Sequence, residues 1–296
     1  MFNRVVVQGE FPMVEQLSLN NYKQGIADLY NQRSQTYDDS SWHLQICRRL
    51  LEYSQVSSGQ QILDIGAGTG HLVLEASRIV ENSGRVIGVD ISIGMLEQAR
   101  DKAEALNLDN VEFQLADADS LNFSANSFDR ILCANTFPWL EHKAATLRLW
   151  HQFLKPDGLI GVHTPAETAY VGYVVFREVL ARYGVVLEPS NRLGTLEECR
   201  KLFLSAGFEA VEIKTEQHGS YLSLDKAKAA WGGNSFPTPR QPKNPLSRLS
   251  EAQIKQAKVE FEAELEARQT QQGVWDDVTT WYVIGRKPKN STLHSN

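Results

Sequence analysis

Short apolar runs alternate with amphipathic segments of helical period along much of the chain. Five runs rich in branched apolar residues predict strands at 61–65, 85–90, 111–115, 128–134 and 159–164. Between them, apolar residues at helical spacing predict helices from about Gly70 to Val80, after Ser92, and from about Glu141 to Phe153. Because nearly continuous apolar strands alternate with helices, the pattern predicts a parallel sheet buried on both faces.

The later part of the chain departs from this alternation. A helix is predicted at 195–206, and two further strands are predicted at 208–217 and 278–285. The intervening residues 223–274 are far too many for a hairpin loop of about 2–5 residues. Their second half predicts a helix that Ser250 caps, with Gln253 three residues on. We expect residues 223–274 to form a helical lid inserted between the last two strands.

Composition adds limits on the class of protein. The chain has 296 residues, 42% of them hydrophobic and 22% charged, and this suits one large domain with an appended region. The net charge of −6 lacks the basic footprint of a nucleic-acid binder, so no nucleic-acid partner is expected. Cys47, Cys133 and Cys199 are scattered, lack metal-ligand spacing and fit a reducing cytoplasm. No signal peptide and no apolar run long enough to span a membrane are found, so we expect a cytoplasmic protein. We also expect no bound metal, because no cluster of side chains has metal-ligand spacing.

A glycine-rich turn follows the first predicted strand, where residues 62–70 read Ile-Leu-Asp-Ile-Gly-Ala-Gly-Thr-Gly. The turn contains three alternating glycines, Gly66, Gly68 and Gly70. Glycine lets the backbone approach a ligand with no Cβ in the way, and the free N–H groups of the next helix face the same ligand. Asp90 ends the second strand, where its carboxylate can accept hydrogen bonds from ribose hydroxyls. These two features predict an adenosine-type cofactor site.

The glycine spacing decides which cofactor is expected. The dinucleotide-binding motif requires its third glycine at position 71, which is His71 in this chain, so that motif is absent. A P-loop requires a lysine after its glycines, and no lysine occurs between Gly66 and Asp90. The pattern Asp64-x-Gly66-x-Gly68-x-Gly70 resembles motif I of the class I methyltransferases that use S-adenosylmethionine. The resemblance implies a Rossmann-like α/β fold with six parallel strands, one antiparallel strand and helices on both faces. It spans residues 25–287, with an N-terminal arm at 1–24 and a disordered tail at 288–296.

The resemblance also implies roles for single residues. Asp64 helps fix the methionine end through the loop and bound water, and Asp90 holds the ribose. Asp117 accepts a hydrogen bond from the adenine amino group, and the next backbone N–H donates to a nitrogen of the adenine ring. As alternatives, Asp117 could simply cap a short helix, or Asp119 could take the adenine-binding role. The predicted cofactor-binding residues are Tyr30, Tyr37, Asp64, Gly66, Gly68, Gly70, Asp90, Ile91, Met95, Asp117, Ala118 and Asn135.

Residues that follow the fourth predicted strand are candidates for the acceptor side. Residues 135–139 read Asn-Thr-Phe-Pro-Trp, which partly resembles the Asn-Pro-Pro-aromatic motif of amino-group methyltransferases. The following residues 140–142 and 154–158 look more like quinone-biosynthesis C-methyltransferases and their "type 11" relatives. Trp139 is therefore predicted as a pocket wall, with core packing as the alternative.

Four further side chains are weaker candidates. Tyr30 and Tyr37 sit where related enzymes close an N-terminal segment over the cofactor, or they simply pack an N-terminal helix. His142 and His163 could each take a proton from an acceptor, and His163 could also bind the substrate, but each also fits a structural histidine.

Trp231 precedes two glycines inside the predicted lid, so it could swing over the pocket and bind the substrate, or it could anchor the insertion. The sequence therefore predicts transfer of a methyl group to an O, N or C atom of a small-molecule acceptor, leaving S-adenosylhomocysteine. An RNA- or protein-modifying methyltransferase and a non-catalytic cofactor-binding module are the alternatives. Neither the acceptor nor the oligomeric state follows from the sequence.

Overall fold

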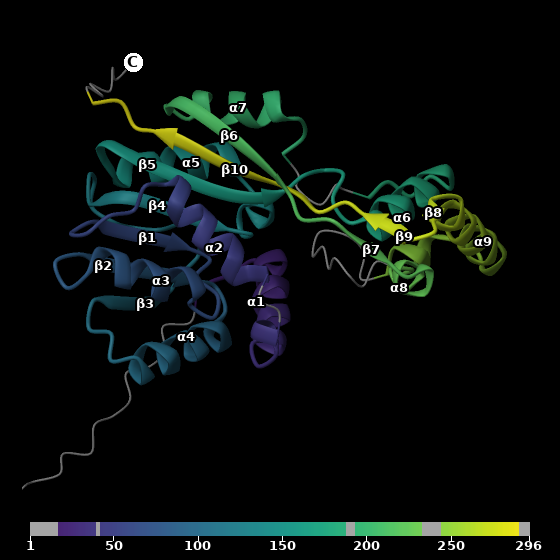
Figure 1. Cartoon of the computed structure of the whole chain (residues 1–296), viewed down its shortest axis with the longest axis horizontal. Coiled ribbons are helices and arrows are strands. Elements are labelled where there is room, and N and C mark those ends of the chain that lie inside the picture. The colour runs from purple at the N-terminus through teal and green to yellow at the C-terminus, as the bar shows by residue number, and fades with distance from the viewer. Residues whose placement is uncertain (1–16, 40–41, 188–192, 233–243, 290–296) are drawn as a thin grey trace, which may run out of the picture.

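The computed structural model describes residues 17–39, 42–187, 193–232 and 244–289. At its centre is a seven-stranded sheet with the strand order β3-β2-β1-β4-β5-β10-β6 (Figure 1). The strands are β1 (Gln61–Ile65), β2 (Arg85–Asp90), β3 (Val111–Leu115), β4 (Phe128–Ala134), β5 (Leu154–Pro165), β6 (Glu209–Gln217) and β10 (Thr279–Arg286). Only β10 runs antiparallel to its sheet neighbours, β5 and β6. The mixed sheet of six parallel strands and one antiparallel strand is confirmed.

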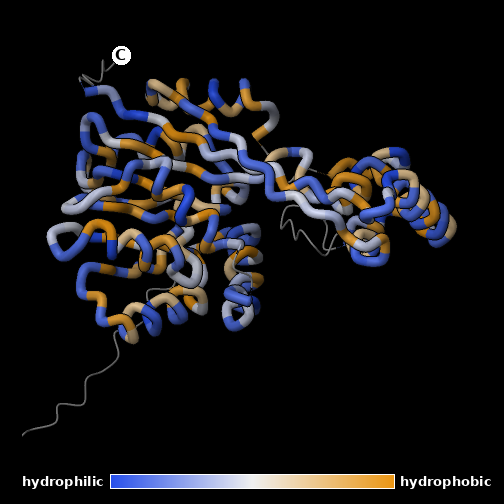
Figure 2. The backbone as a smooth tube through the Cα atoms, viewed as in Figure 1, coloured by the Kyte–Doolittle hydropathy of each residue, from blue (hydrophilic) through white to orange (hydrophobic). Residues whose placement is uncertain are grey.

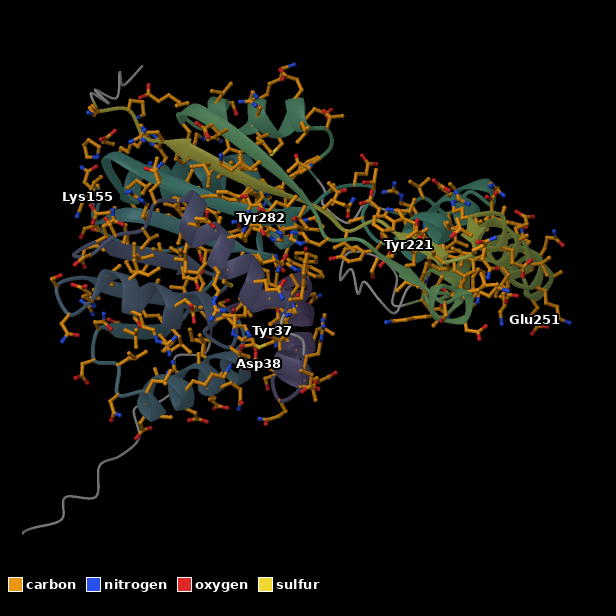
Figure 3. All side chains as sticks on the ribbon, in the orientation of Figure 1. Tyr37, Asp38, Lys155, Tyr221, Glu251 and Tyr282 are labelled. Carbon is orange, nitrogen blue, oxygen red and sulfur yellow. The ribbon has the colours of Figure 1, made fainter. Side chains whose placement is uncertain are left out.

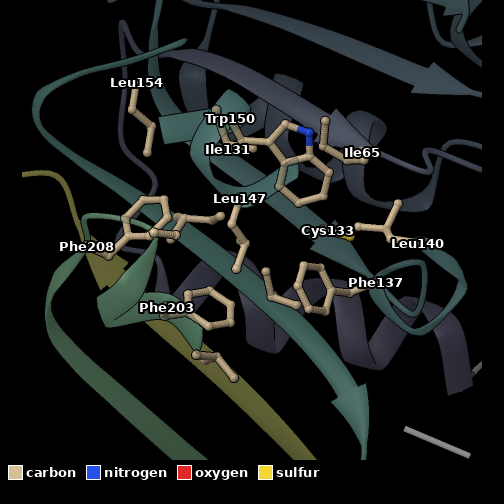
Figure 4. Close-up of a cluster of buried hydrophobic side chains, with 14 of the residues drawn as sticks. Ile65, Ile131, Cys133, Phe137, Leu140, Leu147, Trp150, Leu154, Phe203 and Phe208 are labelled. Atoms are coloured by element: carbon tan, nitrogen blue, oxygen red, sulfur yellow. The ribbon is translucent and has the colours of Figure 1, made fainter. Parts of the chain in front are cut away.

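Helices cover both faces of this sheet. One face carries α2 (Trp42–Tyr53), α3 (His71–Val80) and α4 (Ile93–Ala105), and the other carries α5 (Lys143–Phe153) and α7 (Leu196–Ser205). The central strands β1, β4 and β5 are correspondingly apolar (Figure 2), whereas the edge strand β6 is mostly exposed. In β1, Ile62 packs under α2 and α3, whereas Leu63 packs on the opposite side. Figure 4 shows the core on that side, where Trp150 and Phe203 approach the sheet from two helices.

Local capping signals position two helices as the sequence predicts. Ser92 begins α4 by accepting the Met95 N–H at 3.2 Å. Ser250 and Gln253 form a capping box at the start of α9 (Glu251–Ala267): the Gln253 N–H donates to Ser250 Oγ at 3.3 Å and the Ser250 N–H donates to Gln253 Oε1 at 2.9 Å. Such caps satisfy N–H groups that a helix leaves unpaired at its start.

A smaller unit projects from the end of the sheet where β6 and β10 continue outward (Figure 1). It contains α6 (Val171–Arg182), α8 (Leu224–Lys228), η3 (Pro245–Arg248), α9, and the strands β7 (Ser220–Leu222), β8 (Gln269–Thr270) and β9 (Gly273–Asp276) in the order β7-β9-β8. Its own core includes Phe176, Phe261 and Val274. The predicted insertion therefore packs against α6, a helix that follows β5, and the two segments together form one subdomain.

Three features differ from the sequence pattern. The pattern did not reveal α6, nor α1 (Asn21–Arg33), in which only Ile26 and Ala27 are buried. The helix α1 begins at Asn21, so the last residues of the predicted arm are helical. β5 begins earlier than expected because Leu154 pairs with Phe128 ahead of a register shift. Residues 1–16 of the predicted arm and 290–296 of the predicted tail lie outside the described residues.

The separate core of the subdomain leads to a stability prediction. Phe261 is fully buried and its ring lies 6.2 Å from Phe176 and 5.3 Å from Trp231. We expect Phe261→Ala to lower the free energy of unfolding of this unit by about 3–5 kcal/mol, because a large buried ring is lost. Hydrogen exchange should accelerate in α6, α8 and α9 and stay unchanged in β1–β5. Val259→Ala, on the exposed face of α9, is the control and should leave the exchange rates unchanged. If Phe261→Ala accelerates exchange equally in the subdomain and in the central sheet, the subdomain does not have a separate core.

Candidate active site

The glycine turn between β1 and α3 forms the floor of the site. Gly66, Gly68 and Gly70 all have positive φ angles, of 74°, 55° and 90°. A Cβ on Gly66 would lie 1.9 Å from Thr136 Oγ1, so this position excludes any side chain. The N–H groups of Gly66 and Ala67 both donate to the Val89 carbonyl, at 2.8 and 3.0 Å. The turn is therefore held against the end of β2 with its backbone exposed to a ligand from above.

Asp90 joins the glycine turn to the next helix. Its Oδ2 accepts from the Gly68 N–H and its Oδ1 accepts from the Ser92 N–H, each at 2.8 Å. Burial raises the pKa of Asp90 even though these backbone hydrogen bonds act in the opposite direction. The carboxylate is thus fixed at the carboxyl end of β2, where ligands bind in open α/β sheets.

A cavity of about 90 Å³ opens above this floor. Eleven of the predicted site residues line it: Tyr30, Tyr37, Gly66, Gly68, Asp90, Ile91, Met95, Asp117, Ala118, Asn135 and Trp139. They come from α1, η1 (Tyr37–Asp39), the glycine turn, α4, η2 (Phe137–Trp139) and the ends of β2, β3 and β4. Gly70 instead closes the turn against α4, where a Cβ would lie 3.0 Å from that of Ala99. The structure therefore brings residues from distant parts of the sequence to one hollow at the carboxyl edge of the sheet.

Lys23 of α1 completes the wall beside Asp117. Its Nζ lies 2.5 Å from Asp117 Oδ2 and 2.9 Å from Asp119 Oδ2. Burial would lower the pKa of Lys23, but its bonds to these two aspartates outweigh burial and raise it. Asp117 Oδ1 also accepts from the Asp119 N–H at 3.0 Å. Sequence reasoning missed Lys23 because it assigned residues 1–24 to an arm, and α1 carries little amphipathic signal.

An aromatic roof lies over the cavity. The Tyr30 ring packs edge-on against Trp139 at 6.0 Å and against Tyr37 at 6.2 Å. Tyr22 Oη donates to the Trp139 carbonyl at 2.8 Å, which connects α1 to η2, the short helix that follows β4. Trp139 is partly exposed in the cavity, whereas Phe137, two residues earlier, is the fully buried core residue. This packing favours the pocket-wall interpretation of Trp139.

A second, smaller cavity of about 30 Å³ adjoins the first beneath the glycine turn. The two share Tyr37, Gly66, Gly68, Ala134 and Asn135 as lining residues. Asp64 lines the smaller cavity and is only 1% exposed, and neither of its carboxylate oxygens has a hydrogen-bond partner among the described residues. Burial, followed by the charge of Asp90, raises the pKa of Asp64. An unpaired buried carboxylate is costly, so this cavity fits a ligand that brings a cation or hydrogen-bond donors.

The two candidate proton acceptors lie outside both cavities. His142 is exposed at the start of α5. His163 in β5 is 1% exposed, its ring lies 4.8 Å from that of Tyr282, and burial lowers its pKa to about 3. A buried histidine with so low a pKa is neutral at pH 7 and a weak proton acceptor. The roles of both histidines as bases remain predictions, and the structure offers them little support.

Trp231 is partly buried and packs against the core of the subdomain, away from the larger cavity. Its ring is 5.4 Å from Phe176 and 5.3 Å from Phe261, and it is not among the residues that line either cavity described above. This packing favours the alternative that Trp231 anchors the insertion. Across the described residues, no group of three or more histidine, cysteine, aspartate or glutamate side chains is placed to hold a metal ion. In the same part of the chain, no helix is long and apolar enough to cross a membrane.

Comparison with known proteins decides the family. A model of a methyltransferase domain family matches residues 62–158, which contain the glycine turn, Asp90 and Asp117. Aklanonic acid methyltransferase DauC from Streptomyces sp. (strain C5) is 31% identical over 152 residues, which cover 51% of this chain and 69% of that protein. The chain belongs to the class I S-adenosylmethionine-dependent methyltransferases.

Further relatives agree with this family. The ubiquinone/menaquinone biosynthesis C-methyltransferase UbiE of Cronobacter sakazakii is 32% identical over 183 residues, covering 55% of this methyltransferase and 72% of UbiE. The crystal structure of the YcgJ protein from Bacillus subtilis shares the fold with a TM-score of 0.57 at 23% identity, over 84% of this chain and all of that one. The cofactor is therefore S-adenosylmethionine, and the glycine floor and the unpaired Asp64 fit it.

The position of Asp90 predicts its effect on cofactor affinity. We expect Asp90→Ala to weaken S-adenosylhomocysteine binding by roughly ten- to a hundred-fold, because a charged hydrogen-bond acceptor contributes about 1.5–3 kcal/mol. Calorimetric titration of the folded variant measures this change. Asp109→Ala, an exposed aspartate of the loop before β3, is the control. An unchanged dissociation constant in Asp90→Ala would show that Asp90 does not hold the cofactor.

Proposed function

We propose that this methyltransferase acts on a small-molecule acceptor and transfers the methyl group to an O, N or C atom. The observation that carries the proposal is the partly covered cofactor cavity, whose wall includes Tyr30 and Lys23 of α1. The net charge of −6 argues against nucleic acid as the acceptor. The names of the relatives support the same class, since aklanonic acid and the ubiquinone and menaquinone precursors are small molecules.

The chain's own residues would supply binding and alignment. S-adenosylmethionine, when bound, supplies an activated sulfonium methyl group that a nucleophile displaces in line. We infer that Asp90 holds the ribose, Asp117 and the Ala118 N–H receive the adenine, and Asp64 faces the methionine end. The faces of Tyr30 and Tyr37 would attract a sulfonium cation. Because the cofactor is already activated, proximity and orientation account for most of the protein's contribution.

No strong base is needed in this scheme. His163 is neutral and buried, and His142 is exposed and lines neither cavity. An acceptor with an acidic hydroxyl or a nucleophilic carbon or nitrogen can react without a residue that removes a proton first. We therefore infer that the acceptor's own acidity or nucleophilicity decides which atom is methylated.

The subdomain is the proposed acceptor-selecting unit. It joins the sheet through β6 and β10, and Val171 at the start of α6 donates its N–H to Asp276 Oδ1 at 2.7 Å. The residues that line the cofactor cavity come from other segments, so cofactor binding and acceptor selection fall on separate units. The compartment that we propose is the cytoplasm, and the three buried cysteines without disulfide partners support this.

A metabolite screen tests the proposed acceptor class. Purified protein with S-adenosylmethionine and a cell extract should convert at least one small molecule to a product heavier by one methylene, with equal formation of S-adenosylhomocysteine. The Asp90→Ala variant in the same extract is the matched control and should give far less product. Methylation confined to RNA or protein fractions would contradict the proposal. Cofactor binding without transfer to any fraction would favour a non-catalytic module.

Trp231 gives a test of the acceptor-selecting unit. We expect Trp231→Ala to reduce kcat/KM for the acceptor roughly ten-fold or more, because its loss disturbs the packing of Phe176 and Phe261. Affinity for S-adenosylhomocysteine should stay within a few-fold of wild type, and Trp231→Phe should restore most of the turnover. Normal turnover in Trp231→Ala, or an equal loss of cofactor affinity, would contradict the assignment.

A further inference from the structure

The smaller cavity beneath the glycine turn contains two unpaired polar groups of opposite chemical character. It lies between the first turns of α2 and α3 and the end of β1, and His43, Asp64 and His71 are among its lining residues. It adjoins the larger cavity, with which it shares Tyr37 and Asn135 as lining residues. A ligand that fills the larger cavity can therefore extend a short group into this one.

Asp64 is the acceptor in this cavity. Both carboxylate oxygens are buried without a partner, although the Asp64 backbone is paired on both sides, opposite Gly88 and Leu132. The sheet therefore holds the Asp64 backbone in place, and its carboxyl group lines this cavity. A ligand's ammonium group would satisfy both its charge and its hydrogen-bonding capacity.

His43 supplies the second unpaired polar group of this cavity. Its ring stacks on Tyr37 with the centroids 4.3 Å apart and an interplanar angle of 25°, which fixes its orientation. Its Nδ1 is buried and has no hydrogen-bond partner among the described residues. Figure 3 labels Tyr37 and the adjacent Asp38, which lie close to α1. An imidazole nitrogen that carries a proton here can donate to an anionic or carbonyl oxygen.

The surroundings of His43 leave this nitrogen available. His71 Nε2 lies 2.9 Å from Asp38 Oδ1, and Asp38 also accepts from Thr69 Oγ1 at 2.6 Å and pairs with Lys102. Asp38 is thus occupied by other groups. Burial lowers the pKa of His43 to about 4, so the ring is neutral at pH 7 in the ligand-free site. The charged or titratable groups around it are Arg33, Asp38, Cys47, Asp64, His71 and His163.

We propose that His43 recognises the carboxylate of the cofactor's amino-acid end, opposite Asp64, which the proposed function already places at the methionine end. One donor and one acceptor in a cavity this small match the two ends of an α-amino acid, and neither group alone accounts for both unpaired atoms. The inference deepens the cofactor site and rests on S-adenosylmethionine being the cofactor. His43 is then a specificity-determining residue: it selects ligands that retain the carboxylate.

The test compares two ligands that differ only in this group. S-adenosylhomocysteine and its decarboxylated analogue, S-adenosyl-3-thiopropylamine, are titrated calorimetrically into wild type, His43→Ala and His43→Phe. The Phe variant keeps a ring to stack on Tyr37 but has no nitrogen. Gln45→Ala, an exposed position on the same helix, is the control. 5′-Methylthioadenosine, which lacks the whole amino-acid end, reports on the adenosine part of the site alone.

Wild type should bind S-adenosylhomocysteine about ten-fold or more tighter than the decarboxylated analogue, as expected for a hydrogen bond to a charged group. In both His43 variants this preference should fall to within about two-fold, with 5′-methylthioadenosine affinity unchanged. Asp64→Asn should instead weaken both amine-bearing ligands. If His43→Phe still binds S-adenosylhomocysteine about ten-fold tighter than the decarboxylated analogue, the assignment of His43 is wrong. It is also wrong if the His43 variants lose affinity equally for all three ligands. If wild type binds none of the three ligands, the cofactor assignment itself fails, which separates the two failures.

Discussion

The carboxylate of Asp90 is the constraint on which the site depends. It accepts one N–H from the glycine turn at Gly68 and another from Ser92 at the start of α4, both at 2.8 Å. One side chain therefore fixes the floor of the cavity and the helix beside it relative to the end of β2. The turn has no freedom to adjust on the other side, because Gly66 lies against Thr136. A rigid floor of this kind positions a ligand without further ordering of the chain when the ligand binds.

Two layers of organisation follow from this floor. The first turn of α1 closes one side of the cavity through Lys23 and its two aspartates, and Tyr30 and Tyr37 line the same cavity. The subdomain, with its own apolar core, lies beyond the sheet on the continuations of β6 and β10. The part that binds the cofactor and the part that we propose selects the acceptor thus have separate cores. Such separation lets the acceptor change in a family without disturbing the cofactor site.

Local signals made most of the sheet and the floor of the site predictable from the sequence. Each strand from β1 to β4 coincides with an apolar run, and the caps at Ser92 and Ser250 involve neighbours three residues away. The glycine turn and Asp90 form a motif that can be read from the sequence, because the spacing of these residues is what places them together at the end of the sheet. The structure then brings these residues to one cavity, as their positions after consecutive parallel strands predict.

Other features depend on contacts between residues far apart in the sequence, so no local pattern reveals them. Lys23 meets Asp117 across 94 residues, and α6 becomes a stable helix against α9, which lies much later in the chain. Trp231 was open to two interpretations because its packing partner Phe176 belongs to α6. His43 carries no motif at all, and only its stacking on Tyr37 beside the unpaired Asp64 gives it a proposed role.

A calorimetric competition between cofactors tests the central claim most directly. Purified protein is titrated with S-adenosylhomocysteine and, separately, with NAD at the same concentrations. His71 stands where the dinucleotide-binding motif requires a glycine. We therefore expect saturable binding of S-adenosylhomocysteine at one site per chain and no heat of binding from NAD. Saturable binding of NAD, or no binding of S-adenosylhomocysteine, would contradict it.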